Sequence, residues 1–201
     1  WEEIVQAVHQ LEAQTGCGFG HGARPLLVSV RSGAPVSMPG MMDTVLNLGM
    51  NGETAVALAK ATGGRYGFAA ETFARFARMF AEIVLDVADD VLVDEASRTS
   101  LASVVDEKSL RSAVLLAAES VGATANCAFP IDPWAQLRRA TVAVFKSWNS
   151  RRAVRYREHH GIAHDLGTAV VVQQMVFGNL GSPSGTGVAF TRDPRDGSPK
   201  M

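Results

Sequence analysis

Residues 26–51 read LLVSVRSGAPVSMPGMMDTVLNLGMN, and we expect this stretch to decide both the fold and the site. Its apolar start, residues 26–30, predicts a short buried strand that ends at Arg31 and opens into a loop rich in glycine, proline and serine. Such a loop suits a polyanion, because glycine lets the backbone approach a ligand and loop N–H groups bind phosphate oxygens. Arg31 adds a planar, permanently charged fork. Asp43 and Thr44 predict the start of a helix, whose N-terminus would add positive charge at the same place.

The pattern is neither a Walker loop nor a dinucleotide fingerprint. Residues 30–49, VRSGAPVSMPGMMDTVLNLG, instead resemble the phosphate loop of the pyruvate phosphate dikinase family, which has VRSGA, two variable residues, SMPGMMDT and a short LNLG helix. Pyruvate, water dikinases share the VRS start but lack SMPGMMDT. The resemblance therefore favours the dikinase that uses inorganic phosphate, and within it part of the N-terminal ATP-grasp nucleotide-binding domain.

The resemblance implies roles for individual residues in binding ATP. Arg31 would neutralise the nucleotide phosphates, and the backbone from Ser37 to Gly40 would close over the β and γ phosphates. In ATP-grasp proteins the strand that links the two lobes holds the adenine with backbone groups, and residues 173–176 stand in that place. The expected ATP-binding residues are Arg31, Ser37, Met38, Gly40, Asp43, Thr44, Gln173, Met175, Val176 and Thr186. The resemblance implies no catalytic residue in this chain, and it implies Mg²⁺ with ligands outside it.

Two further blocks follow in the order that the family has. Residues 143–162 resemble the family's AVFRSWxxPRAxxYRxxxxI, which implies that Trp148 and Arg152 lie where a helical insert meets the nucleotide-binding lobe. Residues 172–194 resemble VQxMVFGN, a short loop and SGTGVAFTRDP. The β-branched run at 168–176 predicts a buried strand, and residues 185–191 predict a returning strand after a turn at 177–182. The matching residues of the first block are Ser147, Trp148, Arg152, Ala153, Tyr156 and Arg157.

Apolar periodicity predicts several helices. One spans residues 2–14, a short one spans 53–62, and another spans 107–121 and ends at Gly122. A longer helix between them resembles the family's RFxxDSYRRFIxMF helix, and its stripe is more typical of a core than of a cofactor site. The stripe consists of Phe68, Phe73, Phe76, Met79, Phe80, Ile83, Val84 and Val87.

Asp132 as N-cap with Pro133 in the first turn predicts a further helix. The apolar side expected for it carries Trp134, Leu137, Thr141, Phe145 and Trp148. Four arginines that follow, at 151, 152, 155 and 157, are expected to form a solvated helix face. Residues 94–106 are polar and are expected to form a linker.

The predicted helix at 107–121 departs from the family pattern. The family has a lysine-rich helix of the FKALYKE kind, with a lysine directed at the nucleotide phosphates. Residues 110–120 here read LRSAVLLAAES, and only Lys108 and Arg111 stand at the front of the helix. Either the alignment shifts by a turn or one phosphate contact is missing.

The fold class that we expect is α+β, a partial ATP-grasp nucleotide-binding domain with an inserted all-helical subdomain. Residues 1–50 and 131–176 would form the first lobe, residues 51–130 the helical insert, and residues 177–201 the start of a truncated second lobe. The chain begins at Trp1, inside a predicted helix, and ends just after a turn. We therefore expect it to be a piece of a longer protein.

The composition excludes several classes of protein. With 47% hydrophobic and 19% charged residues among 201, the chain has an ordinary globular composition. A net charge of −1 gives no electrostatic footprint for nucleic acid or an anionic membrane, and the apolar runs are far shorter than the roughly 20 residues of a spanning helix. Cys17 and Cys127 lack metal-site spacing and suit a reducing cytoplasm. None of the five histidines stands in a metal-ligand motif.

The resemblance implies a reaction for the full-length protein. ATP, phosphate and pyruvate would give AMP, pyrophosphate and phosphoenolpyruvate through a phosphohistidine on a separate domain. The partners would be ATP and the phosphohistidine and pyruvate-binding domains of the same chain, and a homodimer is implied by the family alone. We expect residues 1–201 by themselves to bind ATP weakly and to turn over nothing. Two alternatives stay open: the nucleotide domain of a pyruvate, water dikinase, and a degraded non-catalytic binding domain.

Overall fold

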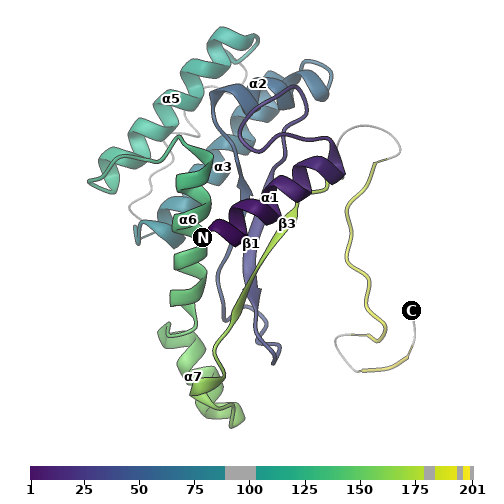
Figure 1. Ribbon diagram of the computed structural model, residues 1–201, viewed down its shortest axis with the longest axis vertical. Helices are drawn as coiled ribbons and strands as arrows, with labels where there is room; N and C mark the ends of the chain where they lie inside the picture. The colour runs from purple at the N-terminus through teal and green to yellow at the C-terminus, as the bar shows by residue number, and fades with distance from the viewer. Residues whose placement is uncertain (89–102, 179–183, 194–196, 200–201) are drawn as a thin grey trace.

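The computed structural model describes residues 1–88, 103–178, 184–193 and 197–199 (Figure 1). Its described strands form an antiparallel sheet in the order β2-β1-β3. The central strand β1 (Val28–Gly33) lies between β2 (Thr44–Leu48) and β3 (Ala169–Gln174). Helices pack against the sheet, so the predicted α+β class is confirmed.

The segment that begins at Thr44 is a strand, so the helix predicted there is wrong. Arg31 pairs with Thr44, and Val30 pairs with Val45, which is fully buried. Thr44 and Val45 are both β-branched, and such residues fit a pleated, half-buried strand better than the first turn of a helix. Asp43 looks like an N-cap residue in the sequence, but the structure here is decided by the pairing of Thr44 with Arg31, which is more than ten residues away. The loop at residues 34–43 therefore leads into a strand and not into a helix N-terminus.

The chain enters the sheet through α1 (Glu2–Thr15), as the periodicity predicts, and this helix ends at Gly16 with a φ of 65°. The following loop is tied back to the helix, because the Phe19 N–H donates to Glu12 Oε1 at 2.7 Å. Phe19 is buried and its ring lies 5.1 Å from that of Trp134. These contacts fix the path by which the chain reaches β1.

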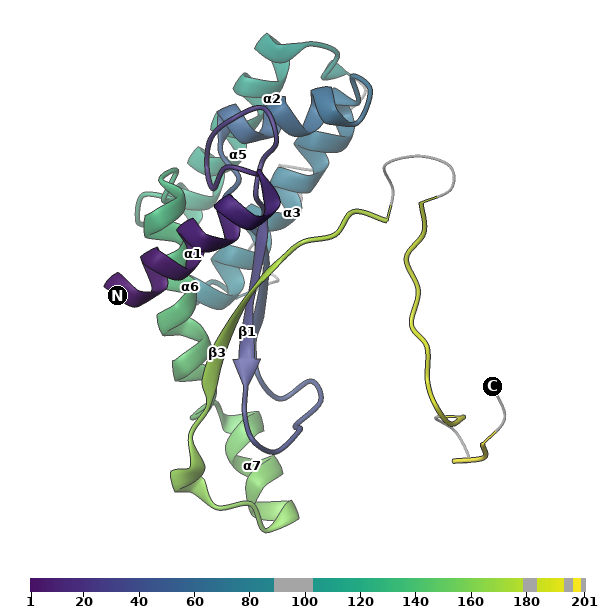
Figure 2. The same cartoon turned by 45° about the vertical axis from the view of Figure 1, so that its right-hand side comes forward.

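Helices α3 (Tyr66–Val84) and α6 (Pro133–Ser147) cover one face of the sheet, and α2 (Gly52–Ala61) and α5 (Glu107–Thr124) pack against α3 (Figures 1 and 2). The stripe predicted on α3 is confirmed, except that Val87 lies beyond the helix end. Three of its phenylalanines contact Phe129 edge-on, with ring centroids 5.4 to 6.0 Å apart. They are Phe73, Phe76 and Phe80.

Helix α5 runs through Gly122 to Thr124, so the predicted end at Gly122 is wrong. The glycine serves close packing instead, because a Cβ there would lie only 2.9 Å from the Cys127 carbonyl oxygen. Asp106 begins the helix as N-cap and accepts a hydrogen bond from the Ser109 N–H at 2.7 Å. Most of the predicted linker, residues 94–102, lies outside the described residues.

Helix α6 (Pro133–Ser147) begins as predicted, with the Asp132 carboxylate accepting from the Ala135 N–H at 2.9 Å. It stops at Trp148, and α7 (Arg151–His160) starts anew after Ser150, whose hydroxyl accepts from the Ala153 N–H. Two predictions here are wrong. Phe145 was expected on the buried side of α6, but it is 48% exposed. Arg157 was expected on a solvated face of α7, but it is 1% exposed.

Strand β3 was predicted to be buried, and this prediction is wrong. Among the described strands it lies at the edge of the sheet, and every second residue is exposed. Residues 184–193 contain no strand and are mostly exposed, so the returning strand expected at 185–191 is absent (Figure 2). Of the turn predicted at 177–182, only residues 177–178 are described. No helix within the described part of the chain is long and apolar enough to span a bilayer.

Candidate functional site

One face of the sheet is turned away from the helices, and we call it the outer face. Successive residues of a strand point to opposite sides. Val28 and Val30 are buried on the helical side, so Arg31 points to the outer face, where it is exposed. Arg31 pairs with Thr44 on one side and with Val171 on the other, which puts all three on this face.

Gln173 lies on the same face as Arg31. It pairs with Ser29, whose hydroxyl donates to the Gln173 carbonyl oxygen at 3.4 Å. Arg31 and Gln173 are thus diagonal neighbours on adjacent strands, which places their Cβ atoms about 7 to 8 Å apart. Arg31 therefore lies on the same surface as Gln173, which is 142 positions later in the sequence and belongs to the segment expected to hold adenine.

Met175 and Val176, the two other residues expected at the adenine, follow β3 and differ in exposure. The Met175 N–H donates to the Leu27 carbonyl oxygen at 2.8 Å, and its side chain packs against the core. Val176 is 87% exposed. The chain thus leaves the sheet after Met175, whose backbone N–H is still bonded to the segment before β1.

Residues 34–43 connect β1 to β2 beyond the end of the sheet (Figure 2), and we call them the phosphate loop because the resemblance predicts that they bind phosphate. Met38 is buried and anchors the loop, and its carbonyl oxygen accepts from the Met41 N–H at 3.1 Å. Ser37 and Gly40 are exposed. Gly40 has a φ of 72° and open space around it, so a ligand can reach the backbone there.

Asp43 lies at the end of the phosphate loop and points to the helical side, away from Arg31. It forms an ion pair with Arg152 on α7, and its N–H donates to the Ser147 hydroxyl at 3.2 Å. Arg152 also donates through Nε to the Met41 carbonyl oxygen at 3.1 Å. We call these contacts of Asp43 and Met41 with Ser147 and Arg152 the clamp. The sequence analysis assigned Asp43 to the ATP site and did not predict the clamp. The motif SWNSRRA, which begins 104 residues after Asp43, contains both partner residues and could have indicated it.

The whole chain, residues 1–201, matches the family described as the pyruvate phosphate dikinase AMP/ATP-binding domain. The chain belongs to this family. It is 44% identical over 207 residues to pyruvate, phosphate dikinase 1, chloroplastic, of Oryza sativa subsp. japonica, and 45% identical over 212 residues to its namesake of Zea mays. Pyruvate, phosphate dikinase of Rhizobium meliloti (strain 1021) is 43% identical over 210 residues.

These matches cover 100% of this chain and 22 to 23% of the relatives. The chain thus spans about a fifth of the length of the dikinases that it resembles. The expected membership is confirmed, and the α+β structure fits part of an ATP-grasp domain.

In this domain a buried arginine, Arg157, connects α7 to the segment that leads into β3. The Arg157 guanidinium donates to the Trp148 carbonyl oxygen and to His164 Nδ1, the latter at 3.1 Å, and lies 4.1 Å from the centroid of the Trp148 ring. Trp148 Nε1 donates to the His164 carbonyl oxygen at 3.0 Å. His164 belongs to the short helix η2 (His164–Leu166) that leads into β3. Trp148 and Arg157 thus fix the segment that leads into β3.

Thr186 is the one expected ATP-binding residue on the segment after residue 183. It lies against Gly178, where a Cβ on the glycine would collide with the Thr186 hydroxyl and the Gly185 carbonyl. Both views show this segment apart from the sheet (Figures 1 and 2). The structure therefore does not bring Thr186 to the outer face beside Arg31.

The described residues offer no group of three or more histidine, cysteine, aspartate or glutamate side chains that could hold a metal ion. Near Arg31, the outer face presents the Thr44 hydroxyl and the Gln173 amide, which are too few hard oxygen ligands for Mg²⁺. The described residues thus do not fit a magnesium site.

Proposed function

We propose that this chain is the ATP-binding part of a pyruvate phosphate dikinase, and that the triphosphate lies across the outer face from Arg31 toward the phosphate loop. The observation that supports this most directly is the placement of Arg31 and Gln173 on one face of adjacent strands. The Arg31 side chain is exposed and, among the described residues, has no hydrogen-bonding or ionic partner. A guanidinium held on a strand without a carboxylate partner is suited to a phosphate.

Each part of the proposed site has its own role. Arg31 neutralises phosphate charge, and exposed N–H groups at Ser37 and Gly40 bind the terminal phosphates as the loop closes. Backbone groups of residues 173–176 bind the adenine. The clamp between Asp43 and Arg152 holds the loop from the helical side. Phosphoryl transfer depends mainly on positioning and charge stabilisation, and these are what the parts supply.

The finer activity belongs to the full-length protein in this proposal. ATP, phosphate and pyruvate give AMP, pyrophosphate and phosphoenolpyruvate through a phosphohistidine on another domain, with Mg²⁺ held by ligands outside residues 1–201. Residues 1–201 alone bind ATP weakly and turn over nothing. Within them we assign 1–50 and 131–176 to the first lobe, 51–130 to the helical insert and 177–201 to the second lobe.

We also propose a cytoplasmic location, since Cys17 and Cys127 are free thiols and suit a reducing compartment. The rice and maize relatives are chloroplastic by name. Fractionation of the source cells, with the protein detected by antibody, tests this assignment. A signal confined to an organelle or to an oxidising compartment would contradict it.

Calorimetric titration of ATP into the full-length protein tests the site. Arg31→Gln keeps the side chain polar but removes its charge, and we expect the Kd for ATP to rise about tenfold, which corresponds to about 1.4 kcal/mol. Arg155→Gln is the matched control, because Arg155 is an exposed arginine on α7, away from the outer face. Equal ATP affinity of wild type and Arg31→Gln would show that the site is misplaced.

Phosphate dependence decides between the two dikinases. Formation of AMP from ATP and pyruvate is expected to require inorganic phosphate in the full-length protein. A rate that ignores added phosphate would favour the pyruvate, water dikinase. Binding of ATP with no AMP formed under any condition would favour a non-catalytic domain, for which α5 gives one reason: Leu115 and Leu116 are each 54% exposed on the helix where the family has lysines.

A further inference from the structure

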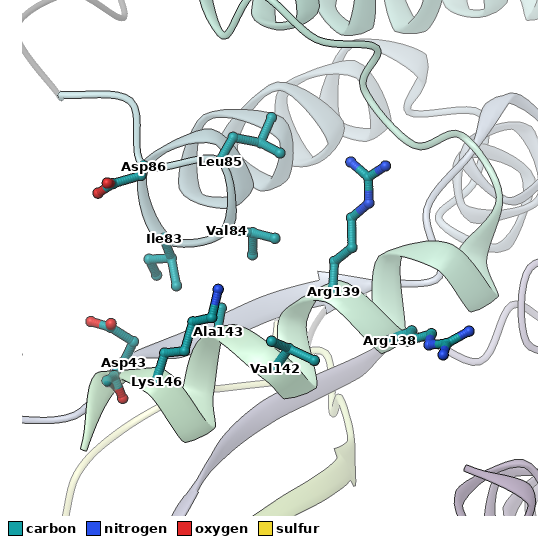
Figure 3. Close-up of a pocket in the computed structure, with 11 residues that line it drawn as sticks. Asp43, Ile83, Val84, Leu85, Asp86, Arg138, Arg139, Val142, Ala143 and Lys146 are labelled. Carbon is teal, nitrogen blue, oxygen red and sulfur yellow. Dashed lines mark hydrogen bonds between the residues drawn. The ribbon is translucent and has the colours of Figure 1, made fainter. Parts of the chain in front are cut away.

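A cavity of about 640 Å³ lies between the C-terminal end of α3 and helix α6 (Figure 3). It is on the helical side of the sheet, opposite the outer face that carries Arg31. Its volume is within the range of small-molecule sites, which is about 300 to 1,000 Å³. The proposed ATP site makes no use of this cavity.

Positive charge lines the α6 wall. Arg139 and Lys146 are seven residues apart, which is two helical turns or about 10 Å, and Figure 3 shows both side chains extending from α6 toward the end of α3. Both are exposed, and neither has an ion-pair or hydrogen-bond partner among the described residues. Arg138 also lines the cavity, with its guanidinium 5.7 Å from the Trp1 ring centroid.

Two carboxylates lie at the margin and do not neutralise these cations. Asp43 is already paired with Arg152. Asp86 follows α3 with a φ of 57°, and Figure 3 shows its carboxylate at the edge of the cavity remote from Arg139. The C-terminal end of α3 contributes only about half a negative charge. The wall therefore keeps unmatched positive charge.

The space between the two cations is apolar. Val142 and Ala143 of α6 lie between them, with Val142 47% exposed, and Val84 faces them from α3. Bare phosphate would reach a cation but leave this surface in water. A ligand with an apolar body covers it and gains about 25 cal/mol for each Å² removed from water.

We propose that this cavity is a binding site for a small amphiphilic anion, with an apolar body against Val84 and Val142 and an anionic group on Arg139 or Lys146. The anion is a carboxylate or a phosphate, since both accept the planar fork of arginine and the ammonium of lysine. The ligand also meets Asp43, at the point where the phosphate loop enters β2. This site stands independently of the proposed ATP binding.

The test uses three probes that share parts of one structure: 1-naphthyl phosphate, 1-naphthol and inorganic phosphate, each titrated calorimetrically into the full-length protein. We expect 1-naphthyl phosphate to bind and the other two to bind about tenfold more weakly, because each offers only half of the recognised chemistry. Replacing 1-naphthyl phosphate by 1-naphthoate distinguishes a phosphate site from a carboxylate site. Equal binding of 1-naphthol and 1-naphthyl phosphate, or no binding of any probe, would overturn the proposal.

Variants locate the binding. Arg139→Gln and Lys146→Gln change exposed side chains and are expected to leave the melting temperature unchanged while the Kd for 1-naphthyl phosphate rises about tenfold, or about 1.4 kcal/mol, in the double variant. Arg155→Gln is the control for general loss of charge. Arg31→Gln is the control for binding on the outer face. If the Kd for 1-naphthyl phosphate rises in Arg31→Gln and stays unchanged in the double variant, the probe binds at the nucleotide site and this inference is wrong.

Discussion

Arg152 and Asp43 form an ion pair that closes the phosphate loop onto α7, across 109 positions of sequence. Arg152 reaches the loop twice, since its Nε also donates to the Met41 carbonyl oxygen. The Arg152 side chain is half exposed, so the pair adds little to global stability, on the order of 0.2 to 1 kcal/mol. Its effect is local: it fixes where the loop re-enters the sheet beside Arg31.

We therefore expect Arg152→Gln to loosen the loop without unfolding the domain. Amide hydrogen exchange of residues 37–43 should accelerate, while the midpoint of thermal unfolding stays within a few degrees of the wild type. If the loop binds phosphate as proposed, the Kd for ATP rises about fivefold, or about 1 kcal/mol. Arg155→Gln is the control on the same helix. Unchanged exchange in the loop would mean that the clamp does not order it.

Unlike Arg152, Arg157 is expected to contribute strongly to global stability, because its guanidinium is buried. Removing it leaves the Trp148 carbonyl and His164 Nδ1 without their donors, so Arg157→Met is expected to lower the free energy of unfolding by about 3 kcal/mol. Urea unfolding followed by tryptophan fluorescence measures this. Arg155→Met, on the exposed side of α7, is expected to stay within about 0.5 kcal/mol of the wild type.

Equal stability of the two arginine variants would contradict this account of Arg157. Arg157→Lys provides a second check. It keeps the charge but cannot place two donors in one plane, so it should recover only part of the loss. Full recovery by lysine would mean that charge alone, rather than the fork geometry, stabilises the turn between α7 and β3.

The helices could be predicted from the sequence because their signals are local. Asp132 and Pro133 begin α6 where a capping residue and a first-turn proline should, and Gly16 ends α1 in the left-handed conformation. The phenylalanine stripe of α3 repeats every three to four residues, and this period alone predicts a buried face. None of these signals depends on a distant part of the chain.

The strands were predicted less well because their structure depends on distant partners. Asp43 and Thr44 satisfy the rule for a helix start, yet pairing with Arg31 makes the segment a strand. The apolar run of β3 implies burial on both faces, but among the described residues the helices cover only one face of the sheet, so Val171 on the outer face is 39% exposed. In the candidate site, Arg31 and Gln173 could be proposed from resemblance, whereas the roles of Ser147 and Arg152 required the tertiary contacts.

Gly122 tests whether close packing outweighs helix propensity. In an exposed helix interior, Gly→Ala stabilises by about 1 kcal/mol, but here the new Cβ would lie 2.9 Å from the Cys127 carbonyl oxygen and 3.3 Å from the Phe129 N. Backbone atoms cannot yield easily, so we expect Gly122→Ala to destabilise by about 1 to 2 kcal/mol in thermal unfolding. Gly52→Ala is the control, since its Cβ would meet only Arg111 Nη1, at 3.6 Å. A stabilised Gly122→Ala protein would show that the turn at 125–128 adapts.

Glu12 is expected to give the domain a pH-dependent contribution to stability. Burial alone would raise the pKa of this carboxyl, but the hydrogen bonds from the Phe19 N–H and His9, with the charges of His9 and His21 nearby, outweigh it and leave the pKa below the ordinary 4.5. The unfolded state therefore takes up a proton at higher pH than the folded state. The contribution is complete above about pH 4.5 and is lost as the pH falls through the lowered pKa.

Glu12→Gln removes the titrating group and keeps an oxygen that can accept from Phe19. We expect the variant to be less stable than the wild type at pH 6, and the difference in the free energy of unfolding to shrink as the pH falls below about 4.5. Urea unfolding at a series of pH values between about 3 and 7 measures it. Glu53→Gln is a control of the same kind, because the exposed Glu53 accepts one bond, from the Gly22 N–H at 3.1 Å. A gap that stays constant across this range would show that the Glu12 charge contributes nothing, and that the loop before β1 is held by the hydrogen bond alone.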